Sequence, residues 1–240
     1  MLVEVCANSL QSAVNAQRGG ADRIELCSEL AVGGITPSYG LLQSVREHIS
    51  IPVHVLIRPR SGDFTYSDRE FEIIKRDVAL CTDLGFEGIV SGVMHQNFTL
   101  DIARTRELVQ SSKGLHFTFH RAFDWVKDPF QALEKLEVMG VDTVLSSGLQ
   151  KSAWEGIDLL ARLNKCSSSC TIMPGGGIGP KNVKEFKDIG FEAVHLSGTR
   201  IIPTLDSLPR IPMSAVSLPT DGEIVVTDVE TIRKVVKRAK

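Results

Sequence analysis

The chain has 240 residues, of which 42% are hydrophobic and 23% charged, and its formal net charge is −2. This composition is typical of globular proteins, and the charge gives no electrostatic reason to expect binding to nucleic acid or to an anionic membrane. No apolar run approaches the roughly 18 residues of a membrane-spanning helix. We expect no signal peptide, and the odd number of cysteines, 5, favours reduced thiols in the cytoplasm.

Short apolar or alternating segments recur along the chain and are separated by longer segments of helical periodicity. Ser and Asp residues of the N-cap type precede most of the helical segments, and Pro180 suits a first helical turn. The expected strands are 2–6, 23–27, 53–58, 88–91, 115–120, 143–146, 171–173 and 193–197. The expected helices begin near Ser9, Ser38, Ser67, Asp101, Asp128, Ser152, Pro180 and Asp228.

A local pattern of Gly, one apolar residue and an acidic residue, followed by a strand, occurs at 20–24, 85–89, 140–144 and 190–194. Glycine fits the left-handed position that ends a helix, so the repeated pattern indicates successive βα units. Eight strands alternating with eight helices predict one α/β domain over 1–240, a (β/α)8 TIM barrel. An open doubly wound sheet is the alternative. It is disfavoured because no Gly-rich dinucleotide loop follows the first strand.

Residues 199–222 interrupt this rhythm. Pro203, Pro209, Pro212 and Pro219 exclude a long helix there. We expect an extended loop before the last helix. It is either a plain surface connection, a lid or an oligomer contact, because long loops without secondary structure are often functional.

The alternation of side chains along the strands predicts an unusually polar barrel interior. Glu4, Arg23, His54 and His116 lie early in their strands, where a buried network of ion pairs is expected. A second set lies near the carboxyl ends of the strands, where barrel enzymes place their chemistry. This set is Cys6, Glu25, Cys27, Arg58, His120 and His195.

The loops after the last two strands predict an anion site. Gly176 and Gly177 follow the strand at 171–173, and Ser197 and Gly198 end the strand at 193–197. Loops at these positions often bind phosphate through backbone N–H groups in barrels of this kind. The alternative is a tight turn that simply requires glycine.

Arginine and acidic residues follow the third and fifth expected strands. Arg58 suits recognition of a carboxylate or phosphate group through its planar guanidinium. Glu25 and His120 are candidates for proton exchange, with Asp124 orienting His120 or a substrate. His195 is a further candidate catalytic residue. The alternative is a set of salt bridges that hold the loops.

Cys6 and Cys27 end neighbouring strands and both face inward. Adjacent strands lie about 4.8 Å apart, so the two sulfur atoms are within reach of each other. Two neighbouring thiolates suit a soft cation such as Cu(I). The alternative is a pair of small buried residues without a function.

Several long motifs together resemble the CutC family, over a stretch from Leu2 to about Thr199. The resemblance implies a cytoplasmic barrel assigned to copper homeostasis, in which Cys6 and Cys27 match the pair proposed to bind Cu(I). It also leads us to expect a homodimer. The matching motifs lie at 4–6, 19–27, 33–38, 57–68, 118–124 and 174–178.

Two hypotheses of different class follow. One is a Cu(I)-binding protein of copper homeostasis. The other is an enzyme, a lyase or isomerase by analogy of fold, that acts on a small anionic or phosphorylated metabolite.

Overall fold

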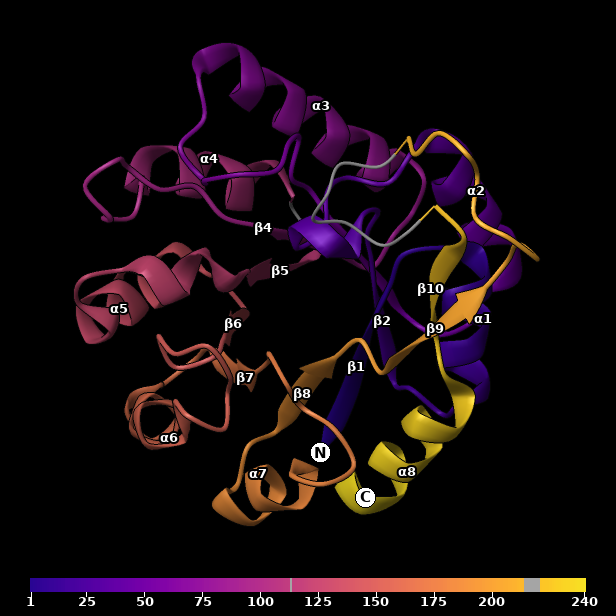
Figure 1. The fold of residues 1–240 in the computed structure, drawn as a ribbon. Helices are drawn as coiled ribbons and strands as arrows, with labels where there is room; N and C mark the ends of the chain where they lie inside the picture. The colour runs from indigo at the N-terminus through magenta and orange to yellow at the C-terminus, as the bar shows by residue number, and fades with distance from the viewer. Residues whose placement is uncertain (113, 214–220) are drawn as a thin grey trace.

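The computed structural model describes residues 1–112, 114–213 and 221–240 and shows a ring of strands enclosed by helices (Figure 1). Eight parallel strands pair in the order β7-β6-β5-β4-β3-β2-β1-β8. A parallel bridge between Gly175 and His195 joins the two ends of this order, so the sheet closes into the predicted (β/α)8 barrel. The strands are β1 Leu2–Ala7, β2 Arg23–Leu26, β3 Val53–Leu56, β4 Gly88–Ser91, β5 His116–Phe119, β6 Thr143–Ser146, β7 Thr171–Pro174 and β8 Ala193–Leu196.

Most helices begin at the predicted caps. The side chains of Ser9, Ser38, Ser67, Asp101, Asp128 and Asp228 each accept a backbone N–H in the first turn of their helix. Within the described ranges, no helix is long and apolar enough to span a membrane. The helices are α1 Leu10–Arg18, α2 Tyr39–His48, α3 Asp68–Asp83, α4 Ile102–Ser111, α5 Pro129–Met139, α6 Ile157–Cys166, α7 Val183–Ile189 and α8 Val229–Ala239.

Two predicted helix starts are wrong. α6 begins after Gly156 and not near Ser152, because Gly156 lies against the backbone after β6, where a Cβ atom would stand 2.0 Å from the Ser147 carbonyl oxygen. α7 begins after Asn182 and not at Pro180. The Asn182 side chain holds the preceding turn closed, since it accepts the N–H of Gly179 at 2.9 Å.

The segment after β8 contains a strand that was expected to be loop. β9 (Thr199–Pro203) pairs antiparallel with β10 (Glu223–Thr227), and this hairpin lies beside α1 (Figure 1). Pro203 ends β9, a position that a residue without an N–H tolerates. Asn15 of α1 donates to the Thr227 carbonyl at 2.8 Å and holds β10 in place. Residues 214–220 of the predicted loop lie outside the described residues.

The strands separate an apolar outer layer from a polar interior, as their alternation predicts. Outward side chains such as Val5, Ile24 and Val194 are fully buried against the helices. Inside, Glu4 and His54 are buried as well, and parallel pairing sets Glu4 level with both Arg23 on β2 and His195 on β8.

These interior side chains form the predicted network. Glu4 Oε2 accepts from Arg23 Nε at 2.5 Å, and Glu4 Oε1 lies 2.8 Å from His195 Nδ1. Burial opposes the charge on Glu4, but His195 and Arg23 outweigh it and hold the pKa of this carboxyl below its usual range. The rings of His54 and His116 stack with centroids 4.8 Å apart. The network therefore fixes the orientation of His195 from below.

Candidate functional site

A cavity of about 260 Å³ opens at the carboxyl ends of the strands. Apolar walls from Leu30, Leu56 and Phe64 surround a small number of polar groups, which is the usual composition of a small-molecule site. Among the predicted site residues, those that line it are Cys6, Glu25, Arg58, His120, Gly176, Gly177, His195 and Ser197. Cys27, Asp124 and Gly198 do not line it.

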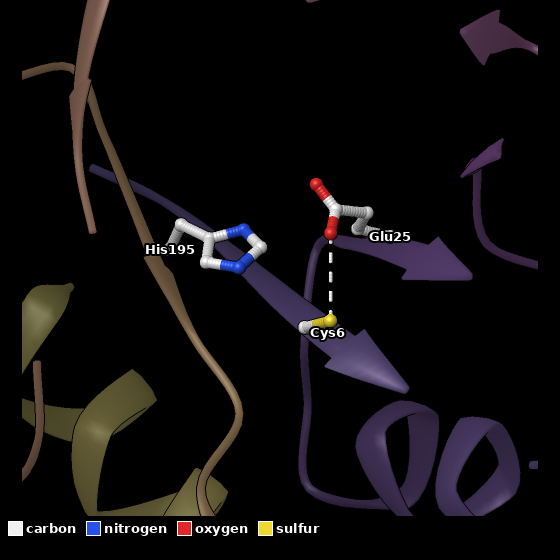
Figure 2. Close-up of side chains that lie close together, drawn as sticks. All are labelled: Cys6, Glu25 and His195. Carbon is white, nitrogen blue, oxygen red and sulfur yellow. Dashed lines mark hydrogen bonds between the residues drawn. The ribbon is translucent and has the colours of Figure 1, made fainter. Parts of the chain in front are cut away.

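Cys6, Glu25 and His195 all line this cavity, and their side chains lie close together (Figure 2). They come from β1, β2 and β8, which are neighbours in the barrel. The Cys6 thiol donates to Glu25 Oε1 at 3.4 Å, and one possible ligand atom from each residue lies within 4.8 Å of the others. A thiol, a carboxyl and an imidazole at this spacing form a candidate metal centre.

The pKa values of all three groups are raised above their ordinary values. Burial works against a charged His195, but the carboxylates of Glu25 and Glu4 outweigh it and raise the pKa of the imidazole. The hydrogen bond to Cys27, together with burial, raises the pKa of the Cys6 thiol. Burial is also the main cause that raises the pKa of Glu25. A metal ion at this cluster must therefore displace protons.

The second predicted thiol lies directly behind the first. Cys27 Sγ is 3.4 Å from Cys6 Sγ, and the Cys27 side chain is buried against Leu56. Gly34 leaves room for it, since a Cβ atom on Gly34 would stand 3.3 Å from Cys27 Cβ. The two thiols are thus adjacent as predicted, although only Cys6 reaches the cavity.

Arg58, which was predicted to recognise a carboxylate or phosphate, has most of its guanidinium bonded to loop carbonyl groups. It donates to the carbonyl oxygens of Val32 and Gly34, both at 2.8 Å, and of Gly62 at 2.7 Å. Arg58 Nε is buried and has no hydrogen-bond partner among the described residues. Arg58 therefore holds two loops at the mouth, which was the structural alternative in the prediction.

His120 is a neutral hydrogen-bond donor. Its Nδ1 accepts the N–H of Ala122 at 3.2 Å, which places the proton on Nε2. Burial, with the nearby charge of Arg58, lowers the pKa of His120 to about 3. Nε2 is buried without a partner in the described part of the chain. An imidazolium acid at neutral pH is therefore excluded for this residue.

Asp124 does not contact His120, contrary to the predicted orienting role. Its Oδ1 accepts from Ser146 Oγ at 2.6 Å and from the N–H of Ser147 at 2.9 Å. Its Oδ2 accepts from Arg121 Nε at 2.7 Å. The carboxylate is directed toward β6. Asp124 therefore positions Arg121 and the loop after β6.

The glycine loop lies at the cavity as predicted, and one residue beside it was missed. Gly176 and Gly177 have φ angles of +96° and +78°. Arg121 lines the cavity beside them. Gly198 has a packing role, since a Cβ atom there would stand 2.5 Å from Ile232 Cδ1. Strand alternation does not predict the direction of Arg121, because this residue lies in the 3-10 helix η2 (Arg121–Trp125). Its position directly after the candidate His120 was the available signal.

The chain is similar in sequence to known proteins. The family model described as the CutC family matches residues 1–200. A family protein CutC from Enterobacter sp. (strain 638) is 44% identical over 222 residues, which cover 92% of this chain and 89% of the relative. One from Edwardsiella ictaluri (strain 93-146) is 46% identical over 204 residues, with coverages of 85% and 81%.

Solved structures give the same result. The crystal structure of CutC from Streptococcus agalactiae, a protein named for copper homeostasis, has a TM-score of 0.78 at 30% identity and covers 82% of this chain and 98% of that one. The 3-hexulose-6-phosphate synthase of Salmonella typhimurium shares the fold alone, with a TM-score of 0.60 at 17% identity and coverages of 100% and 98%. The sequence matches and the barrel geometry agree, and the chain belongs to the CutC family.

Proposed function

We propose that this protein binds Cu(I) through Cys6 and Cys27 and serves copper homeostasis. The observation that carries the proposal is the distance of 3.4 Å between the two buried sulfur atoms. Thiolates are soft ligands that select Cu(I), and imidazole also suits copper. His195 is the proposed third ligand, because Glu4 at 2.8 Å from Nδ1 orients the ring as carboxylates commonly do behind a metal-bound histidine.

The donor set fits the ion with a small adjustment. Two sulfurs that share one ion through bonds of about 2.3 Å at a tetrahedral angle stand about 3.8 Å apart. The present separation of 3.4 Å requires a shift of only a few tenths of an ångström. The raised pKa of Cys6 means that binding releases a proton, so affinity for copper rises with pH.

Competition with a Cu(I) chelator tests the proposal. The Cys6→Ser, Cys27→Ser double variant is expected to bind more than roughly 100-fold more weakly, since even groups behind a ligand are worth about 10- to 100-fold in affinity. Cys166→Ser removes an exposed thiol and is the matched control. Equal affinity in the double variant and the wild type contradicts the assignment. Competition by Zn²⁺ in the wild type measures selectivity for the soft ion.

A second function is favoured by a separate observation. Glu25 Oε2, Arg58 Nε and His120 Nε2 are buried without partners among the described residues, and all three side chains line the cavity. Copper at the two thiols leaves these groups unused. We therefore propose, as the alternative, an enzyme for a small anionic metabolite. Its anionic group would lie at Gly176, Gly177 and Ser197.

In this alternative, Glu25 exchanges a proton with the substrate, because its carboxyl group lines the cavity and burial raises its pKa. Lyase or isomerase chemistry is proposed from the likeness of fold. A thermal-shift screen of phosphorylated and carboxylated metabolites tests it. A ligand at 100 times its Kd adds about 2.7 kcal/mol to the stability, or about 5–11 °C for a chain of this size. Absence of a shift across the library contradicts the enzyme proposal.

We also propose that residues 1–240 form one domain and that the protein is a cytoplasmic homodimer. Leu208, Ile211 and Met213 are exposed on the segment after β9, which supports an additional interface there. Light scattering after size exclusion tests the dimer, with Ile211→Lys expected to shift the mass toward the monomer.

A further inference from the structure

The geometry points to a phosphate-monoester subsite at the mouth of the cavity, in which Arg121 is the charged residue that binds the phosphate. This inference rests on the alternative function proposed above and names its substrate class. The subsite comprises Arg121, Gly177, Ile178 and Ser197. Gly177 and Ser197 were predicted from the sequence to bind an anion, whereas Arg121 and Ile178 were not.

The guanidinium of Arg121 is held in a fixed plane. Its Nε donates to Asp124 Oδ2 and its Nη2 donates to Ser147 Oγ, both at 2.7 Å. Across residues 1–112, 114–213 and 221–240, Nη1 has no acceptor. The side chain is 43% exposed, so this free edge is accessible from the mouth. A prepositioned planar donor of this kind favours an anion with several oxygens.

The glycine loop leaves a gap in front of this edge. A Cβ atom on Gly176 would stand 3.4 Å from Arg121 Nη1 and 3.5 Å from Ser147 Cβ, so a side chain there would enter the space between the loop and the guanidinium. The next two residues, Gly177 and Ile178, present backbone N–H groups without a partner in the described ranges. Successive free N–H groups of this kind form a small anion-binding concavity.

A hydroxyl group in the lining of the same cavity is a further donor. The Ser197 hydroxyl lines the cavity and makes no hydrogen bond with the described residues. The Asp124 carboxylate has both oxygens bonded to Arg121, Ser146 and Ser147, and Glu25 contributes a carboxyl group to the cavity itself. A phosphate monoester supplies three oxygens in different directions, which matches a guanidinium, two amides and a hydroxyl better than a planar carboxylate does.

The His120 side chain in the cavity lining indicates the chemistry of the rest of the substrate. His120 offers Nε2–H, because its Nδ1 accepts from Ala122, and this donor has no partner in the part of the chain described. A hydroxyl or carbonyl oxygen satisfies it. The cavity of about 260 Å³ suits a small molecule. The substrate class is therefore a phosphate ester of a small hydroxy or oxo compound.

The test measures binding of inorganic phosphate by calorimetry and by thermal shift, at constant ionic strength, with acetate as the comparison anion. Arg121→Gln is expected to weaken phosphate binding at least about tenfold, which is the worth of one hydrogen bond to a charged group. Arg76→Gln removes the same charge from an exposed position on α3 and is the matched control, expected to remain within about twofold of wild type. Arg121→Lys keeps the charge without the planar donor and is expected to lie between them.

Ser197→Ala is a second variant that leaves the fold intact, because the hydroxyl makes no bond to lose. It is expected to weaken phosphate binding several-fold. Absence of phosphate binding in the wild type, or equal binding in Arg121→Gln, overturns the subsite. If the metabolite screen finds carboxylates that bind while phosphate does not, the subsite fails and the enzyme proposal stands. Phosphate binding is expected to persist in the double cysteine variant, which separates this inference from the copper proposal.

Discussion

Replacement of Glu4 by glutamine tests how the polar interior contributes to stability. The Glu4 side chain is fully buried, with Arg23 Nε at 2.5 Å from one oxygen and His195 Nδ1 at 2.8 Å from the other. The amide keeps the size of the side chain but removes its charge and presents an NH₂ to one of these two donors. Arg23 is left buried without its counter-charge. Breaking a buried ion pair from one side costs about 3–5 kcal/mol.

The assay is urea unfolding of Glu4→Gln and wild type, followed by far-ultraviolet circular dichroism. We expect a loss of about 4 kcal/mol in the free energy of unfolding, which corresponds to a decrease in Tm of about 8–16 °C for a domain of this size. The matched control is Asp68→Asn, which breaks an ion pair with Arg104 of the same 2.5 Å length on the surface, where Asp68 is 97% exposed. Exposed pairs contribute about 0–1 kcal/mol. A loss below about 1 kcal/mol in Glu4→Gln refutes the reasoning.

The pH dependence of the same pair of proteins provides a second readout. The folded state lowers the pKa of Glu4 below its ordinary value of 4.5. The stabilisation is therefore fully present above pH 4.5 and is lost as the pH falls toward the folded pKa. Glutamine does not titrate. The difference in stability between the two proteins is expected to shrink below pH 4.5, and a difference that grows in acid contradicts the assignment.

Three further predictions concern other buried groups. His54 and His120 have pKa values lowered to about 3 from 6.5, so the unfolded chain binds protons that the folded chain does not. Stability should fall by about 1.4 kcal/mol per pH unit for each histidine below pH 6.5, as measured by urea unfolding between pH 7 and 4. Arg58→Lys is expected to lose about 2 kcal/mol and to speed hydrogen exchange in both loops that its fork holds, since an ammonium does not reproduce three directed bonds. Gly34→Ala places a Cβ atom 3.3 Å from Cys27 Cβ at a φ of +85°. We therefore expect Cu(I) affinity, measured by chelator competition, to fall in this variant. The control is Gly40→Ala, whose Cβ atom lies in open space and is expected to leave the affinity unchanged.

The fold follows from local signals that repeat. The barrel strands are short, and polar and apolar side chains alternate along β2 and most of β1, so outward apolar residues such as Val5 and Ile24 were predictable from the sequence. The alternation is not strict in β4, β6 and β7. The errors in the predicted helices and strands arise where contacts between residues distant in sequence determine the structure. Gly156 sets the start of α6 because it meets the backbone after β6, and no local pattern contains that contact. β9 was hidden because its partner strand is distant in sequence and its own segment is rich in proline.

The site was predictable where its residues lie in strands. Cys6, Glu25 and His195 lie in β1, β2 and β8, and alternation alone gives their direction. Arg58 and Asp124 follow their strands, and there the path of the loop decides where a side chain is directed. The Nη atoms of Arg58 donate to loop carbonyl groups, and Asp124 accepts from Ser146 and Ser147. Such bonds are visible only in three dimensions.

The polar interior has two levels, and both hold a buried polar atom without a partner among the described residues, since His54 Nδ1 is such an atom in the lower level. Early in the strands, Glu4 is bonded to both Arg23 and His195. Near the carboxyl ends, Glu25 and His120 each keep a buried polar atom without a partner in the described chain. Each such atom costs about 1–3 kcal/mol, and an apolar side chain of similar shape would avoid the cost. Stability alone therefore does not account for these residues at the cavity, whereas binding of a group that satisfies them does.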